Sequence, residues 1–133
     1  MALVVLDASV VIGFLDPNDA LHQACVDALA AHQRDELVIP LTVYAEILVA
    51  PFRVGSEAVS EVEAFLADFA IRIGEITPSM ARAAAKLRSG KHGLRLPDAL
   101  VVAFGEENEA DAVLTADEEW PKVTKRAVLV ASA

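Results

Sequence analysis

Four acidic residues interrupt apolar segments of this chain, and their types and spacing suggest chemistry. They are Asp7, Glu46, Asp98 and Asp117. Asp7 and Asp117 each follow a short apolar run of the kind that forms a buried strand in a parallel sheet. The other two lie within apolar stretches of helical spacing. Burying a carboxylate is costly unless a cation or hydrogen-bond donors compensate for it, so the pattern predicts a shared metal ion.

Each of these acids also has a purely structural explanation. Asp7 can cap the helix that follows it, and Asp98 sits near a helix start, where a carboxylate favours the helix dipole. Glu46 can be an exposed helical residue, and Asp117 can be a turn residue. Taken together, the four acids favour a shared site over four separate structural roles. Two parallel strands would bring Asp7 and Asp117 to one sheet edge, and the helices that carry the other two acids can flank it.

An all-oxygen ligand set favours Mg²⁺, or Mn²⁺ as its substitute, over softer metals. The three histidines are scattered and have no zinc-site spacing; they are His22, His32 and His92. A pair of carboxylate-bound ions can hydrolyse a phosphodiester, because one ion lowers the pKa of the attacking water and the other stabilises the leaving oxygen. Whether the site holds one ion or two stays open.

Three neighbouring polar residues are candidates for supporting roles. Ser9 lies two residues after Asp7, where its hydroxyl can bond a carboxylate or a phosphate, or cap the helix. Thr115 points to one face of its strand and can orient a carboxylate. Glu119, two residues past Asp117, is a candidate for a further metal ligand.

The charge of the chain is distributed unevenly. The net charge of -9 argues against a nucleic-acid partner, but the segment 76–97 contains five basic residues and no acid. This basic stretch is a candidate for holding the phosphates that flank a cleavage site, and a solvated helix face explains it equally well. His92 within it is either a surface residue or a phosphate contact. The basic residues are Arg82, Lys86, Arg88, Lys91 and Arg95.

Length and composition predict one domain spanning residues 1–133. The apolar share of 55% is enough for a substantial core, and the single cysteine, Cys25, rules out an intrachain disulfide and fits a small core side chain. No apolar run approaches the roughly 20 residues that span a membrane, and a charged leader is absent. We therefore expect a soluble, cytoplasmic protein.

The pattern along the chain predicts an α/β sandwich around a mainly parallel sheet. Thr42 is expected to cap one helix, a break is expected from Pro51 to Gly55, and Asn18 or Asp19 is expected to cap another. The predicted strands are 2–6, 37–39, 70–76, 112–116 and 127–131, and the predicted helices are 8–15, 19–33, 43–51, 56–69 and 96–107. A further helix is predicted to start at Thr77-Pro78, with Gly90 and Gly93 marking its end.

The order of these elements and motifs resembles the PIN-domain ribonucleases, specifically the VapC-type toxins of bacterial toxin–antitoxin pairs. The resemblance covers essentially the whole chain. It implies a three-layer α/β/α fold, metal-dependent cleavage of RNA by the four acids, an antitoxin that blocks the active site, and a homodimer. The motifs that carry it are Asp7-Ala8-Ser9, Val43-Tyr44-Ala45-Glu46, Leu96-Pro97-Asp98-Ala99-Leu100 and Leu114-Thr115-Ala116-Asp117-Glu118-Glu119-Trp120.

The leading hypothesis is therefore a metal-dependent endoribonuclease that a cognate antitoxin suppresses. A catalytically silent PIN-type module that binds RNA or protein is the first alternative, although all four acids are present. The second is a receiver-like signalling domain, which needs a phosphoacceptor aspartate after a central strand and a late lysine. Here the strand at 37–39 ends at Pro40 without an acid, and Lys122 or Lys125 would have to serve as the lysine.

Overall fold

Five parallel strands form the centre of the molecule, in a computed structural model that describes residues 1–91 and 93–132. His92, with its two predicted roles, lies outside the described residues. The strand order is β3-β2-β1-β4-β5, and every pairing is parallel. The strands are β1 (Leu3–Leu6), β2 (Glu36–Pro40), β3 (Arg72–Gly74), β4 (Ala112–Thr115) and β5 (Ala127–Leu129).

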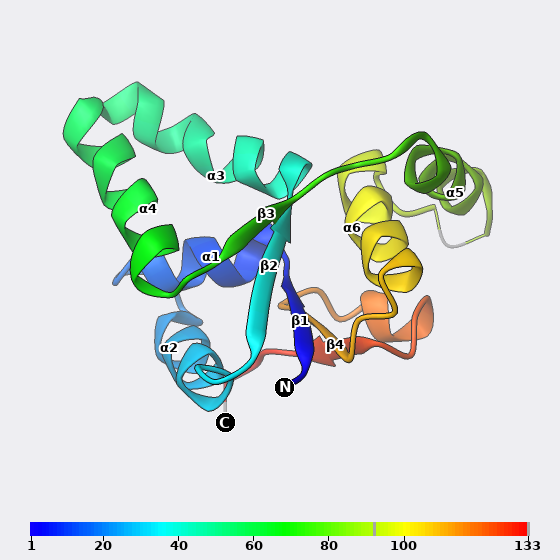
Figure 1. Cartoon of the computed structure of the whole chain (residues 1–133), viewed down its shortest axis with the longest axis horizontal. Coiled ribbons are helices and arrows are strands. Elements are labelled where there is room, and N and C mark those ends of the chain that lie inside the picture. The colour runs from blue at the N-terminus through cyan, green and yellow to red at the C-terminus, as the bar shows by residue number, and fades with distance from the viewer. Residues whose placement is uncertain (92, 133) are drawn as a thin grey trace.

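Helices cover both faces of this sheet and complete the predicted three-layer α/β/α fold. In Figure 1 the helices α1, α2 and α4 lie on one side of the strands, and α5 and α6 lie on the other. A short 3₁₀ helix, η1 (Trp120–Lys122), precedes β5. The helices are α1 (Ala8–Leu15), α2 (His22–Ala31), α3 (Leu41–Val54), α4 (Ser56–Asp68), α5 (Pro78–Ser89) and α6 (Leu96–Glu107).

The central strands are apolar because both of their faces are covered. Val4, Val5 and Leu6 of β1 have no exposed surface, and all four residues of β4 are buried. Helix α6 packs closely on this sheet, since a Cβ atom at Gly105 would lie 2.6 Å from Cγ2 of Val113. The site-bearing ends of β1 and β4 are therefore held in a rigid core.

The predicted end of the third helix is wrong. Helix α3 passes through Pro51 and ends at Val54, because a proline in the last turn removes only one intrahelical hydrogen bond. The break comes at Gly55, whose φ of +149° favours glycine. Thr42 lies inside the first turn and does not cap it, and α4 starts immediately afterwards at Ser56.

Two other elements, α2 and β3, are shorter than predicted. Helix α2 starts at His22, because the carboxylate of Asp19 accepts the N–H of Leu21 in a turn ahead of the helix. Strand β3 contains only three residues at the sheet edge.

The prediction for Cys25 is confirmed, since its side chain is fully buried in the core. Across the described chain, none of the helices has the length and apolar character needed to cross a membrane.

Candidate active site

The predicted site residues lie around the carboxyl edge of the sheet. Strands β1 and β4 are parallel neighbours with Leu6 opposite Leu114, so the residues that follow both strands leave the same edge. Helix α3, which carries Glu46, begins directly after the last residue of β2. Asp98 occupies the first turn of α6. Each acid thus comes from a different segment of the chain.

Asp7 is the most buried of the four acids, with 7% of its surface exposed. It is the N-cap of α1, and its Oδ1 atom accepts the N–H of Ala8 at 2.7 Å. Its Oδ2 atom accepts two hydroxyl groups, from Ser9 at 2.8 Å and from Thr115 at 2.9 Å. The structural and the site interpretations of Asp7 therefore describe the same residue: it starts a helix, and its carboxylate is held at the sheet edge.

The two hydroxyl groups also fix the loop that carries Asp117. The Ser9 hydroxyl oxygen accepts the N–H of Ala116 at 3.1 Å, and the Thr115 hydroxyl oxygen accepts the N–H of Asp117, also at 3.1 Å. Each hydroxyl therefore donates to Asp7 and accepts from the loop. This hydroxyl bridge ties the residues after β1 to the residues after β4.

The charges of the four acids act on one another. Burial raises the pKa of Asp7, and the charge of Asp98 raises it further against the hydrogen bonds that lower it. Partial desolvation of its carboxyl group is the first cause of the raised pKa of Glu46, although the residue as a whole is exposed, and the charges of Asp7 and Asp98 follow. Burial also raises the pKa of Asp98, with a smaller increase from Asp117. Asp98 is therefore coupled electrostatically to each of the other three acids.

A cation would relieve this repulsion, and the donor chemistry is that of a hard divalent ion. As they are placed, however, no three acidic, histidine or cysteine side chains within the described residues form a group that could hold a metal. Glu46 is exposed and has no hydrogen bond to another described residue, so its side chain can rotate. The residue types fit Mg²⁺ or Mn²⁺, and closing around an ion requires side-chain movement.

Glu119, the predicted further ligand, has two interactions of its own. Its backbone N–H donates to Oδ1 of Asp117 at 2.9 Å, which supports the turn after β4. Its carboxylate pairs with the ammonium group of Lys122 at 3.2 Å, and both side chains are largely exposed. A role as metal ligand would require this surface pair to open, and it stays a prediction.

The predicted basic residues are all exposed, but they occupy different places. Arg82, Lys86 and Arg88 lie on α5, and Lys91 lies in the loop that follows it. Arg95 is the N-cap of α6, and its Nε atom lies 3.4 Å from Oδ2 of Asp98. Among the ion pairs of the described residues, this is the one that reaches any of the four acids.

A groove beside Glu46 is a feature that the sequence analysis missed. It has a volume of about 380 Å³ and lies between α1, α3 and α4. Glu46, Ala50 and Val54 line it from α3, and their spacing of four residues was the available signal. Ile12 of α1 adds an apolar side chain that is 43% exposed. Of the four acids, only Glu46 lines this groove.

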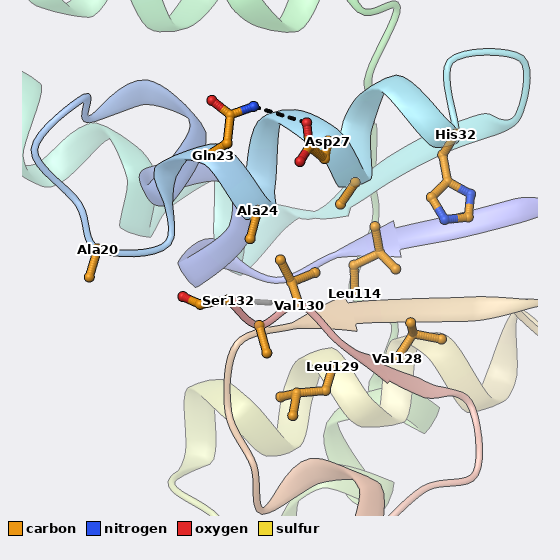
Figure 2. A pocket seen from close by; sticks show the side chains of 12 residues that line it. Ala20, Gln23, Ala24, Asp27, His32, Leu114, Val128, Leu129, Val130 and Ser132 are labelled. Atoms are coloured by element: carbon orange, nitrogen blue, oxygen red, sulfur yellow. Dashed lines mark hydrogen bonds between the residues drawn. The ribbon is translucent and has the colours of Figure 1, made fainter.

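A second groove lies away from the predicted site. It has a volume of about 530 Å³ and lies between α2 and the segment 128–132, as Figure 2 shows. Its α2 wall carries Gln23 and Asp27, which are joined by a hydrogen bond of 2.9 Å. None of the predicted site residues lines it.

Fold and site together define a parallel α/β protein with four acids placed around the carboxyl edge of its sheet. The family model described as the PIN domain matches residues 4–126. The chain therefore belongs to the PIN-domain family, as the motifs predicted. Comparison with curated protein sequences found no significant match.

Three solved structures have the same fold as this chain. A toxin–antitoxin complex from Klebsiella pneumoniae has a TM-score of 0.80 at 18% identity and covers 98% of this chain and 99% of its own. VapC20 from Mycobacterium tuberculosis, described as a sarcin–ricin loop cleaving toxin, has a TM-score of 0.74 at 17% identity, covering 90% and 94%. VapBC2 from Rickettsia felis, bound to a promoter DNA fragment, has a TM-score of 0.75 at 14% identity, covering 96% of both chains.

The receiver-like alternative is wrong, and the strand order gives the physical reason. Receiver domains of the flavodoxin type order their strands 2-1-3-4-5. Here the order is 3-2-1-4-5, which places β1 between β2 and β4. The acid after β1 therefore meets the loop after β4 directly, and β3 moves to the sheet edge.

Proposed function

We propose that this chain is a metal-dependent endoribonuclease and the toxin of a toxin–antitoxin pair. The observation that carries the proposal is the buried Asp7 carboxylate, bridged by two hydroxyl groups to the loop of Asp117 and repelled by Asp98. Membership of the PIN-domain family and the fold shared with VapC20, itself described as a sarcin–ricin loop cleaving toxin, support the same proposal.

The proposed roles of the residues follow from their positions. Asp7, Glu46, Asp98 and Asp117 would hold Mg²⁺ or Mn²⁺, with Glu119 as a further ligand. When bound, the ion would supply water activation and charge stabilisation for phosphodiester hydrolysis. Ser9 and Thr115 keep the Asp7 carboxylate in one orientation through their hydroxyl groups. Exposed basic residues on α5 and before α6 would hold the flanking phosphates of the RNA.

The groove beside Glu46 supports the proposal of an antitoxin partner. Its floor is apolar, and three acids, Asp16, Glu46 and Glu61, lie along it. A segment with apolar side chains and at least one basic side chain would match both features. Such a segment would also place its cation beside Glu46 and so block the acidic site. This complementarity favours an antitoxin peptide as the occupant of the groove.

Cleavage of RNA by the purified chain tests the proposed activity. We expect cleavage with Mg²⁺ or Mn²⁺ and none after chelation. Asp7→Asn and Asp98→Asn should each reduce the rate by at least about a hundredfold, because each removes a charge from the proposed metal site. The matched control is Asp68→Asn at the exposed end of α4, which should cleave like the wild type. Undiminished cleavage by either site variant would exclude the mechanism.

One observation favours a second candidate, a PIN-type module that binds RNA or protein without catalysis. Within the described residues the acids do not form a closed metal-binding group as they are placed. Calorimetric titration with Mn²⁺ separates the two candidates. The nuclease is expected to release or absorb heat in a saturable titration that Asp98→Asn weakens, whereas a silent module would show no saturable binding.

A homodimer is also proposed, with α3 as the interface. This helix carries Leu41, Val49 and Phe52 with 51%, 50% and 68% of their surfaces exposed. Large apolar side chains gathered on one helix mark an interaction surface more often than chance exposure does.

A further inference from the structure

Arg95 places a positive charge of the chain itself against the acidic site. It is the N-cap residue of α6, three residues before Asp98. The Nε atom of Arg95 is 3.4 Å from Oδ2 of Asp98. The two side chains differ sharply in exposure, at 82% for Arg95 and 16% for Asp98. The guanidinium group therefore caps a nearly buried carboxylate from the solvent side.

The charge of Arg95 reaches acids on two separate elements. It lowers the pKa of Asp98 on α6, opposing the effect of burial. It also lowers the pKa of Glu46 on α3, which belongs to the other side of the site. The remaining ion pairs of the described residues join partners outside these four acids. Among the described residues, Arg95 is thus the basic side chain that is ion-paired with one of these acids.

The ion pair between Arg95 and Asp98 is weak enough for a metal ion to displace it. At 3.4 Å and with an exposed guanidinium group, this ion pair contributes little to stability. A divalent cation beside the same carboxylate has twice the charge and attracts it more strongly at equal distance. Once such an ion is present, it also repels the guanidinium group. The long side chain of arginine can then turn to solvent, where a phosphate would be a bidentate partner.

We propose that Arg95 is a resting counter-ion that a divalent cation displaces from Asp98, and that the released guanidinium group then binds a phosphate of the RNA. The inference rests on the proposed function and adds a coupling to it. Without RNA, Arg95 competes with the metal. With RNA, metal and polyanion bind cooperatively, because each favours the displaced position of Arg95. Linkage requires this effect to be reciprocal.

Mn²⁺ affinity measured by calorimetry on the RNA-free protein tests the competition. Arg95→Gln should bind Mn²⁺ on the order of threefold more tightly than the wild type, the size expected when an exposed ion pair is removed. Arg95→Lys, which keeps the charge, should stay close to the wild type. Arg34→Ala is the matched control, since it removes an exposed positive charge before β2 at the opposite sheet edge. Its affinity should not change.

The coupling is tested by repeating the titration with a cleavage-resistant phosphorothioate oligonucleotide. It should tighten Mn²⁺ binding to the wild type and to Arg34→Ala, and should tighten it much less for Arg95→Gln. Mn²⁺ binding that is equal or weaker in Arg95→Gln without the oligonucleotide would overturn the competition. Equal tightening in all variants would overturn the coupling. Absence of Mn²⁺ binding to every variant would instead overturn the proposed function, which keeps the two failures apart.

Discussion

At the scale of single residues, the central feature is that Asp7 has two roles in one conformation. Its backbone and Oδ1 atom begin α1, while its Oδ2 atom faces the hydroxyl groups of Ser9 and Thr115. These hydroxyl groups lower the pKa of a carboxyl group whose burial raises it. The two hydroxyl groups therefore favour the ionised form that burial disfavours, so substitution of either hydroxyl residue tests the site as directly as substitution of Asp7.

Thr115→Val should reduce cleavage more than its effect on stability explains. The substitution removes one donor to Asp7 and the acceptor of the Asp117 N–H, at a cost of about 1–2 kcal/mol in the free energy of unfolding. Thr124→Val is the control, because Thr124 is also buried and bonds Glu106 away from the site. Urea unfolding and RNA cleavage are measured on both. Equal activities in two equally destabilised variants would contradict the proposed orienting role.

Glu46→Gln should stabilise the metal-free protein at neutral pH. Burial and two neighbouring carboxylates raise the pKa of Glu46 above its ordinary value of 4.5, so the folded chain binds more protons than the unfolded chain between these two values. Stability therefore falls as the pH rises through that window, and the penalty is complete above it. Thermal melts should show a higher Tm for the variant at pH 7 and no difference below about pH 4.

A second variant, measured in the same thermal melts, tests whether the crowding of carboxylates causes the gain in Tm. Asp68→Asn removes one exposed negative charge at the end of α4 and controls for the change in net charge. If its gain in Tm at pH 7 equals that of Glu46→Gln, net charge and not the crowding of carboxylates is the cause. Saturating Mn²⁺ should reverse the order and favour the wild type.

At the scale of elements, the site depends on how closely α6 approaches the sheet. Gly74 of β3 and Gly105 of α6 leave room for Phe104 and Val113, respectively. This packing seats the C-terminal half of α6 on the sheet, and the same helix carries Asp98 in its first turn. The approach could not be predicted from the sequence, because a glycine in a strand or helix pattern does not reveal which side chain occupies the space.

Gly74→Ala should therefore destabilise the fold. The added methyl group would overlap the ring of Phe104 and contact Val38, and overpacking of this kind costs about 1–3 kcal/mol. Gly90→Ala is the matched control, because its nearest neighbour is the Leu87 carbonyl oxygen at an ordinary 3.5 Å. The midpoints of urea unfolding compare the two. A midpoint for Gly74→Ala as high as that of Gly90→Ala would mean that Phe104 moves aside freely.

At the scale of the whole molecule, the surface divides into regions of different chemistry. An acidic edge carries the four carboxylates, an apolar groove adjoins it, and α3 presents exposed apolar side chains beyond the groove. In Figure 1, α3 and α4 extend away from the sheet on the side opposite α5. This arrangement leaves α3 accessible to a second copy of the chain.

Phe52→Glu should convert the proposed dimer into a monomer. Phe52 is 68% exposed, so the folded monomer loses little packing, while a charge in a buried interface is costly. Sedimentation velocity at micromolar concentration is the measurement, with thermal melts to confirm folding. Val128→Glu on the exposed part of β5 is the control and should sediment like the wild type. A wild-type chain that sediments as a monomer would refute the proposed interface.

The sequence alone determined the kinds of elements, their order and the four acids. These properties depend on local patterns: apolar runs for buried strands, helical spacing for amphipathic helices, and acids at their ends. Local patterns are less informative about boundaries: Pro51 predicts a break, but the helix continues to Val54. There the backbone geometry of Gly55 decides where the helix ends.

Only the tertiary structure decided how these residues meet. The bond from Thr115 to Asp7 joins positions 108 residues apart and exists because β1 and β4 are parallel neighbours in the correct register. The groove beside Glu46 likewise exists because α1, α3 and α4 pack against one another. Residue types and spacing predict which groups can do chemistry. Strand order and packing set the distances between those groups, and chemistry depends on these distances.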